Sequence, residues 1–149
     1  MRETFFQTGG DWDSTTLHLN GMEVPAEQLY IELRAGRDEW DGEPTGGGIR
    51  QGADLTAYVT PSEAPDAPMD LLPGRITCEF PGYTLIIENT HPEVFTDHTQ
   101  VWLNGRDITR AVVDLLVDIN AVEDDVRAYV SEYKDRFILR DELITHTIL

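Results

Sequence analysis

The sequence LHLNGMEVP at residues 17–25 recurs as VWLNGRDIT at residues 101–109. In each copy an alternating apolar segment is followed by Asn-Gly, an acidic residue and a branched apolar residue. Asn and Gly both tolerate positive φ, which a type I′ turn requires at its two central positions. The repeat therefore predicts two tight β-hairpins, with their turns at Asn20-Gly21 and Asn104-Gly105.

The similarity continues beyond the hairpins with a constant offset of 84 residues, from residues 29–33 onto residues 113–117. Apolar residues alternate with other residues in both stretches, which indicates strands with one buried face. In the second copy Asp114, Leu116 and Asp118 are then expected to point away from the core. After a gap, residues 54–59 also resemble residues 125–130.

These matches predict a single β-rich domain over residues 1–149, with related segments at about 14–60 and 98–135. The expected architecture is mainly β, an antiparallel sandwich or barrel built from two related halves. A third hairpin is expected around Pro81-Gly82, between the two copies. A Gly-rich loop at 36–52 and a Pro-rich loop at 61–73 exceed the usual loop length, which is typical of binding loops or spacers.

Residues 121–136 are compatible with two structures. Their apolar residues from Val126 to Phe137 fall at helical spacing after Asn120, a possible helix cap. The internal repeat instead favours a strand for residues 125–130, and we prefer that interpretation. One short helix near 121–136 stays an alternative.

Charge limits the classes of partner. The chain of 149 residues has 28 Asp plus Glu against 11 Lys plus Arg, which gives a formal net charge of −17. Phosphate contacts need a basic face, so direct nucleic-acid binding is not expected, and neither is docking on anionic lipid. No apolar run is long enough for a membrane helix, and residues 1–10 do not resemble a classical secretory signal.

The sequence offers no recognisable catalytic pattern. No serine stands in a nucleophile-elbow motif, no paired acids have calcium-loop spacing, and the single Cys78 cannot form an internal disulfide. We therefore expect a protein that is not an enzyme and uses no cofactor or metal. Large aromatic residues are common interface anchors, so Trp40 and Trp102 are candidate interface residues, together with Asp114, Leu116 and Asp118.

The Asn-Gly-x-Asp-Ile-Thr element at residues 104–109, followed by an alternating strand, resembles small β-rich proteins of tailed-phage virions. Such elements recur in tail, baseplate and head-associated proteins of actinobacteriophages and their prophages. The resemblance covers about 50 residues at the C-terminus and some 20 near the N-terminus. It implies a non-catalytic assembly or accessory role, with other protein subunits or further copies of the chain as partners, in a virion or the host cytoplasm.

A second hypothesis explains the charge differently. An acidic protein can mimic DNA and occupy the basic cleft of a host defence or regulatory protein, because spaced carboxylates imitate phosphates. Such a mimic would concentrate its carboxylates in a stripe along one face. The acids of this chain are scattered through nearly every segment, which favours the assembly role.

Overall fold

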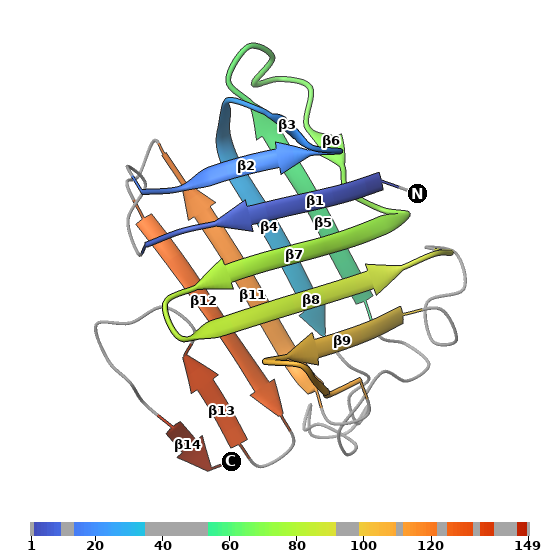
Figure 1. Cartoon of the computed structure of the whole chain (residues 1–149), viewed down its shortest axis with the longest axis vertical. Helices are drawn as coiled ribbons and strands as arrows, with labels where there is room; N and C mark the ends of the chain where they lie inside the picture. The colour runs from blue at the N-terminus through green and yellow to red at the C-terminus, as the bar shows by residue number, and fades with distance from the viewer. Residues whose placement is uncertain are drawn as a thin grey trace, which may run out of the picture.

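Two seven-stranded sheets pack face to face in the computed structural model (Figure 1). The structure describes residues 2–9, 14–34, 54–91, 99–109, 112–121, 125–132, 135–138 and 146–148. Sheet A contains, in spatial order, β10 (Arg106–Asp107), β9 (Thr99–Leu103), β8 (Tyr83–Asn89), β7 (Gly74–Phe80), β1 (Arg2–Gln7), β2 (Thr16–Leu19) and β3 (Met22–Glu23). Sheet B contains β14 (His146–Ile148), β13 (Asp135–Ile138), β12 (Asp125–Glu132), β11 (Val112–Asn120), β4 (Ala26–Arg34), β5 (Asp54–Pro61) and β6 (Met69–Asp70).

The predicted mainly β sandwich is confirmed, and the barrel alternative is wrong because the two sheets are not hydrogen-bonded into one closed sheet. One pairing departs from the antiparallel expectation. Strand β1 runs parallel to β7, with Arg2 opposite Gly74 and Gln7 opposite Glu79. Alternation of apolar residues shows which face of a strand is buried. The same alternation occurs whether the neighbouring strand runs parallel or antiparallel. The sequence pattern therefore contains no signal for this parallel pair.

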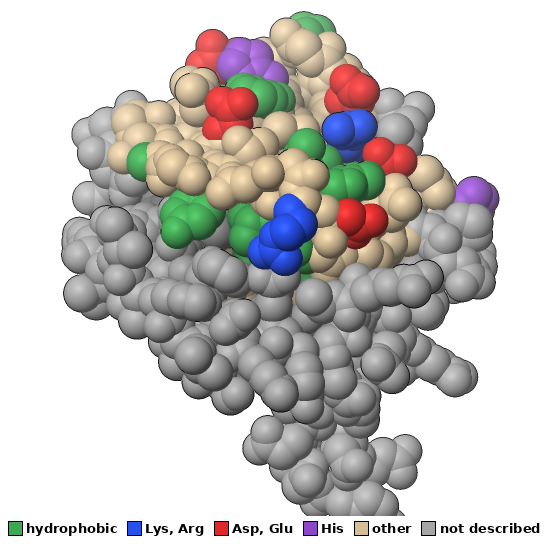
Figure 2. Space-filling view, turned by 60° about the horizontal axis from the view of Figure 1, so that its bottom comes forward, with side chains coloured by type: hydrophobic (Ala, Val, Ile, Leu, Met, Phe, Trp, Pro, Cys, Tyr) green, Lys and Arg blue, Asp and Glu red, His purple; other side chains and the backbone are tan. Residues whose placement is uncertain are grey.

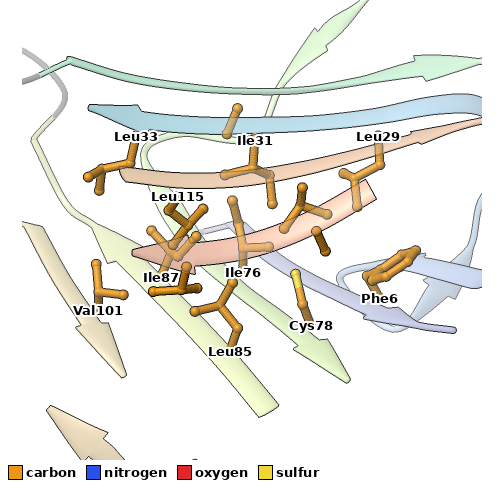
Figure 3. Packing of buried hydrophobic residues seen from close by; sticks show 14 of the residues in the cluster. Phe6, Leu29, Ile31, Leu33, Ile76, Cys78, Leu85, Ile87, Val101 and Leu115 are labelled. Carbon is orange, nitrogen blue, oxygen red and sulfur yellow. The ribbon is translucent and has the colours of Figure 1, made fainter. Parts of the chain in front are cut away.

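The core lies between the sheets and consists of the inward side chains of both (Figure 3). Sheet A supplies Ile76, Leu85 and Ile87, which are fully buried, and sheet B supplies Ile31 and Leu33 from β4. Burying each such side chain contributes about 1.5–3 kcal/mol. Cys78 is also part of this core, and burial raises the pKa of its thiol to about 12. Its complete burial among the core side chains indicates a structural position.

Both Asn-Gly turns have the backbone geometry that the repeat predicts. Asn20 and Gly21 have φ of 51° and 83°, and Asn104 and Gly105 have φ of 52° and 80°. Each turn joins a strand to a two-residue partner, β2 to β3 and β9 to β10. The two hairpins lie at opposite edges of sheet A.

Each turn asparagine also fastens its hairpin to the preceding strand. The Oδ1 atom of Asn20 accepts a hydrogen bond from the backbone N–H of Glu3 at 2.8 Å, and its own N–H donates to the Glu3 carbonyl at 2.7 Å. Asn104 makes the same two contacts with Thr84, each at 2.8 Å. The repeat thus extends to β1 and β8, although the sequence comparison does not reach these strands.

A pseudo-two-fold relation connects the halves. Strands β4 and β11 are antiparallel neighbours at the centre of sheet B, and Glu32 lies opposite Leu116, its equivalent 84 residues later. Two side-chain contacts, one part-buried and one buried, occupy corresponding positions in the two halves. Thr8 and Thr15 join their hydroxyls at 2.9 Å, and Asn89 donates to the Thr99 hydroxyl at 2.6 Å. Strand β7 lies between β1 and β8 and has no counterpart.

The strand interpretation of residues 125–130 is confirmed, and the helix alternative near 121–136 is wrong for the residues that the structure describes. Strand β12 covers 125–132 and β13 covers 135–138. Ala128 and Val130 are buried while Tyr129 is half-buried, so period two prevails over the helical spacing.

The second sequence match is displaced in the structure. Ala57 lies opposite Ile31, whereas Val130 lies opposite Leu115, the equivalent of Ile31. Val130 is 73 residues after Ala57, but the sequence match uses an offset of 71, so the strands differ by two residues in register. An even displacement keeps the same residues on the core side, because side chains alternate with period two.

Two further segments differ from the expected pattern. A β-bulge at Val112/Asp114 interrupts β11, and Val112 is buried where the alternation predicts an inward Val113. Residues 61–73 are not only a loop, since β6 within them pairs with β5.

The predicted third hairpin is present as β7 and β8, with Gly82 at φ 84°. The Gly-rich segment 36–52 lies outside the described residues.

The contacts of the turn asparagines predict matched losses of stability. Replacing Asn104 with Ala removes the acceptor for Thr84 and puts a Cβ-bearing residue with no local hydrogen bond at positive φ, so the free energy of unfolding should fall by about 1–2 kcal/mol. N20A should cost a similar amount. N104G tolerates the φ and should cost less than N104A, and N104D, which keeps the acceptor, should cost least.

Urea unfolding at neutral pH measures these differences. A loss below about 0.3 kcal/mol for both alanine variants would show that the turns do not depend on asparagine.

Candidate functional site

A row of side chains crosses the outer face of sheet A. Strand register places Trp102 opposite Ile86, Ile86 opposite Thr77, Thr77 opposite Phe5, and Phe5 opposite His18. We call these five residues the cross-strand row. All alternate with core-facing neighbours, so they point to solvent, where Phe5 is 37% exposed and the other four are half-buried. The row places one large apolar or aromatic side chain on each of β9, β8 and β1.

The two related halves contribute equally to this row. Thr77 is its midpoint, His18 and Trp102 are repeat equivalents, and Phe5 and Ile86 occupy corresponding positions of β1 and β8. An acid stands at each end, since Glu23 is opposite His18 and Asp107 is opposite Trp102. The row therefore has an apolar or aromatic side chain on each side of the central Thr77 and an acid at either end.

At the Trp102 end a cation already covers the aromatic ring. The guanidinium carbon of Arg75 lies 5.9 Å from the Trp102 ring centroid, and its Nη1 lies 3.7 Å from Oε2 of Glu88. Asp107 accepts hydrogen bonds from the backbone N–H and the hydroxyl of Thr109, at 2.9 and 2.6 Å. The charged groups around Trp102 thus have partners within the chain.

The Phe5 end is different. Phe5 and His18 meet edge to face, with ring centroids 6.5 Å apart. Beside them lies an open hollow of about 430 Å³. Its lining includes Glu3, Phe5, His18, Gly21, Arg75 and Thr77. Neither Glu3 nor Glu23 forms an ion pair with another described residue.

Charges on the visible described surface are interspersed. Figure 2 shows the acidic side chains as separate small groups among hydrophobic and uncharged ones, without a carboxylate stripe on the described part of this view. On this part of the surface, acidic side chains are thus interspersed with hydrophobic, basic and uncharged ones.

The outer face of sheet B carries three of the residues that the sequence singles out. Asp114, Leu116 and Asp118 all point outward from β11 and are half-buried. Asp118 forms an ion pair with Arg127 at 2.9 Å and accepts a hydrogen bond from Gln28 at 3.1 Å. Asp114 lies 3.9 Å from Arg34, so both carboxylates have basic neighbours within the sheet face.

Tyrosines continue this second face. Tyr30 stacks on Tyr58 with ring centroids 5.4 Å apart, and its hydroxyl donates to Oε2 of Glu32 at 2.8 Å. That hydrogen bond, with burial and the charges of Glu32 and Asp118, raises the pKa of Tyr30 to about 12. The Tyr30 phenol therefore stays neutral at pH values well above the usual tyrosine pKa of about 10.

The structure does not bring all predicted interface residues together. Trp102 lies on the outer face of sheet A, while Asp114, Leu116 and Asp118 lie on the opposite side of the sandwich. Trp40 lies outside the described residues. Sequence reasoning missed Phe5 and Ile86. They lie in one row with Trp102 because of the order of strands in sheet A, which the sequence does not indicate. The alignment of His18 with Trp102 was the one available signal for their related positions.

Sheet A ends in the two-residue strands β3 and β10, and residues of both are exposed. Among the described residues no group of three or more His, Cys, Asp or Glu side chains is placed to hold a metal ion. No helix within the described ranges is long and apolar enough to cross a membrane.

Comparison with known proteins yields no relative for this chain: no family model, curated protein or solved structure matches it significantly.

The Tyr30 contact predicts a measurable shift. Removing the Glu32 carboxylate with E32Q should lower the pKa of Tyr30 from about 12 towards 10, because the strongest cause of the shift is lost. The folded-state pKa is raised, so the stability from this contact is present below pH 10 and is lost as pH rises through about 12. Carbon NMR of labelled tyrosine, assigned with Y30F, measures the pKa.

D114N is the matched control, since it removes a carboxylate from the same face that does not influence Tyr30. Equal shifts in E32Q and D114N would contradict a specific Tyr30–Glu32 contact.

Proposed function

We propose that this protein is a non-catalytic binding module that packs the outer face of sheet A against another protein subunit. The main support for this proposal is the cross-strand row, because its aromatic and aliphatic side chains face solvent and charged residues lie at its ends. Protein interfaces commonly have such an apolar centre and polar rim. The resemblance of residues 104–109 to phage virion proteins supports an assembly or accessory role in a virion or prophage product.

The row contains the side-chain types that dominate binding energy. Trp102 and Phe5 are rigid aromatic side chains, and Ile86 lies between them along the strand register. Residues of this kind at the centre of an interface each cost about 1–3 kcal/mol of binding when truncated. The charged groups at the ends are then rim residues, which influence orientation and association rate more than affinity.

The edge strands of sheet A favour binding of a partner across the outer face over addition of a partner strand at an edge. Strands β3 and β10 are two residues long, and their residues Glu23, Arg106 and Asp107 are charged. Short, charged edge strands discourage pairing with another chain. A partner is therefore expected to lie across sheet A.

The arrangement of acids gives less support to a DNA mimic. On sheet B, Asp118 is paired with Arg127 and Asp114 lies 3.9 Å from Arg34. Paired carboxylates are poorer imitations of a phosphate row than free ones, because the arginines cancel their field. The assembly role is thus the better supported of the two hypotheses.

Site-specific photo-crosslinking tests this proposal. A benzophenone amino acid introduced at Phe5 or at Ile86 should give covalent adducts with one defined protein, or with a second copy of the chain, in cells of the native source. Mass spectrometry identifies the adducts.

The same amino acid at Thr56, an exposed position on β5 of sheet B, is the control. It should not yield that adduct. A lack of adducts from both sheet A positions, or equal adducts from Thr56, would overturn the proposed interface.

A further inference from the structure

We infer that the hollow beside Phe5 receives the cationic side chain of an arginine or lysine presented by a partner protein. This inference rests on the proposed function and names the chemistry of the partner. The occupant is a side chain on a basic part of the partner surface, packed over Phe5 and His18 and neutralised by Glu3.

The lining of the hollow has the groups that such a side chain needs. Phe5 offers a partly exposed ring, held edge to face by His18. Cations are attracted to aromatic faces within about 6 Å of the ring centroid. Glu3 lines the same hollow, Glu23 faces His18 across β2 and β3, and neither has an ion-pair partner among the described residues. The Glu3 carboxylate of the lining is thus available to a cationic side chain, and Glu23 lies beyond His18 at the edge of sheet A.

The related end of the row shows the same chemistry with its cation in place. There Arg75 lies over Trp102 and approaches Glu88. His18 is the repeat equivalent of Trp102, and no guanidinium covers it in the described structure. Arg75 also borders the hollow and lies opposite Glu3 in the register of β1 and β7, but its ion pair is with Glu88. The fold therefore satisfies one aromatic end internally and leaves the other open.

Overall charge decides between possible occupants. A second copy of this chain would also carry a formal charge of −17, and its approach to Glu3 and Glu23 would be repelled. A cationic side chain of a different protein is attracted by the same field. Charge complementarity thus favours a basic partner over self-association at this hollow.

NMR titration of the ¹⁵N-labelled protein tests the inference with a defined probe. N-acetyl-arginine amide should cause saturable shifts centred on the amides of Phe5, His18 and Thr77, at concentrations on the order of millimolar or above. N-acetyl-citrulline amide, a neutral analogue of similar shape, should bind several-fold more weakly.

Two charge-matched variants separate local recognition from the general acidic field. E3Q should weaken binding of the arginine probe roughly 3–10-fold, as expected when a charge-assisted contact is lost. E63Q removes the same charge at an exposed residue outside the hollow and should leave the affinity unchanged.

Equal weakening by E3Q and E63Q, or shifts spread over all acidic surfaces, would overturn the inference. So would preferential binding of acetate at this position, since Arg75 would then recognise an anion. Crosslinks from Phe5 and Ile86 would still support the proposed interface after such a result, so the two failures are distinguishable.

Discussion

Positive φ at an asparagine, with its side chain hydrogen-bonded to the preceding strand, is the constraint on which both halves of this protein depend. Asn20 and Asn104 each reverse the chain and satisfy the backbone of β1 or β8 through one carbonyl oxygen. Because asparagine tolerates this conformation and also offers an acceptor, one residue joins a turn to sheet assembly. The two outer hairpins of sheet A therefore have the same position relative to the core, and the pseudo-two-fold relation follows.

Sequence reasoning succeeded where local chemistry determines the structure. Asn-Gly turns and period-two alternation were sufficient to predict the hairpins, the buried faces of β4 and β11, and a sandwich as one of two expected architectures. It failed where the result depends on packing between distant segments. The parallel pairing of β1 with β7 and the bulge at Val112 leave no mark in local alternation.

The candidate site was harder to predict than the fold for the same reason. Trp102 was identified from its residue type, but its neighbours Ile86 and Phe5 come from strands whose order in the sheet the sequence does not indicate. Asp114, Leu116 and Asp118 were correctly expected to face outward, yet they lie on the other sheet. The charge of −17 includes acids in ion pairs, as at Asp118 with Arg127, and acids without an ion pair among the described residues, as at Glu3.

Hydroxyl-radical footprinting tests the central claim, that sheet A is the binding face, most directly. The oxidation of Phe5, Ile86 and Trp102 would be compared between the purified protein and the protein in its native assembly, with Tyr58 of sheet B as internal reference. We expect strong protection of the three sheet A residues and unchanged oxidation of Tyr58. Unchanged oxidation of the cross-strand row, or protection confined to Tyr58, would contradict the assignment of the binding face to sheet A.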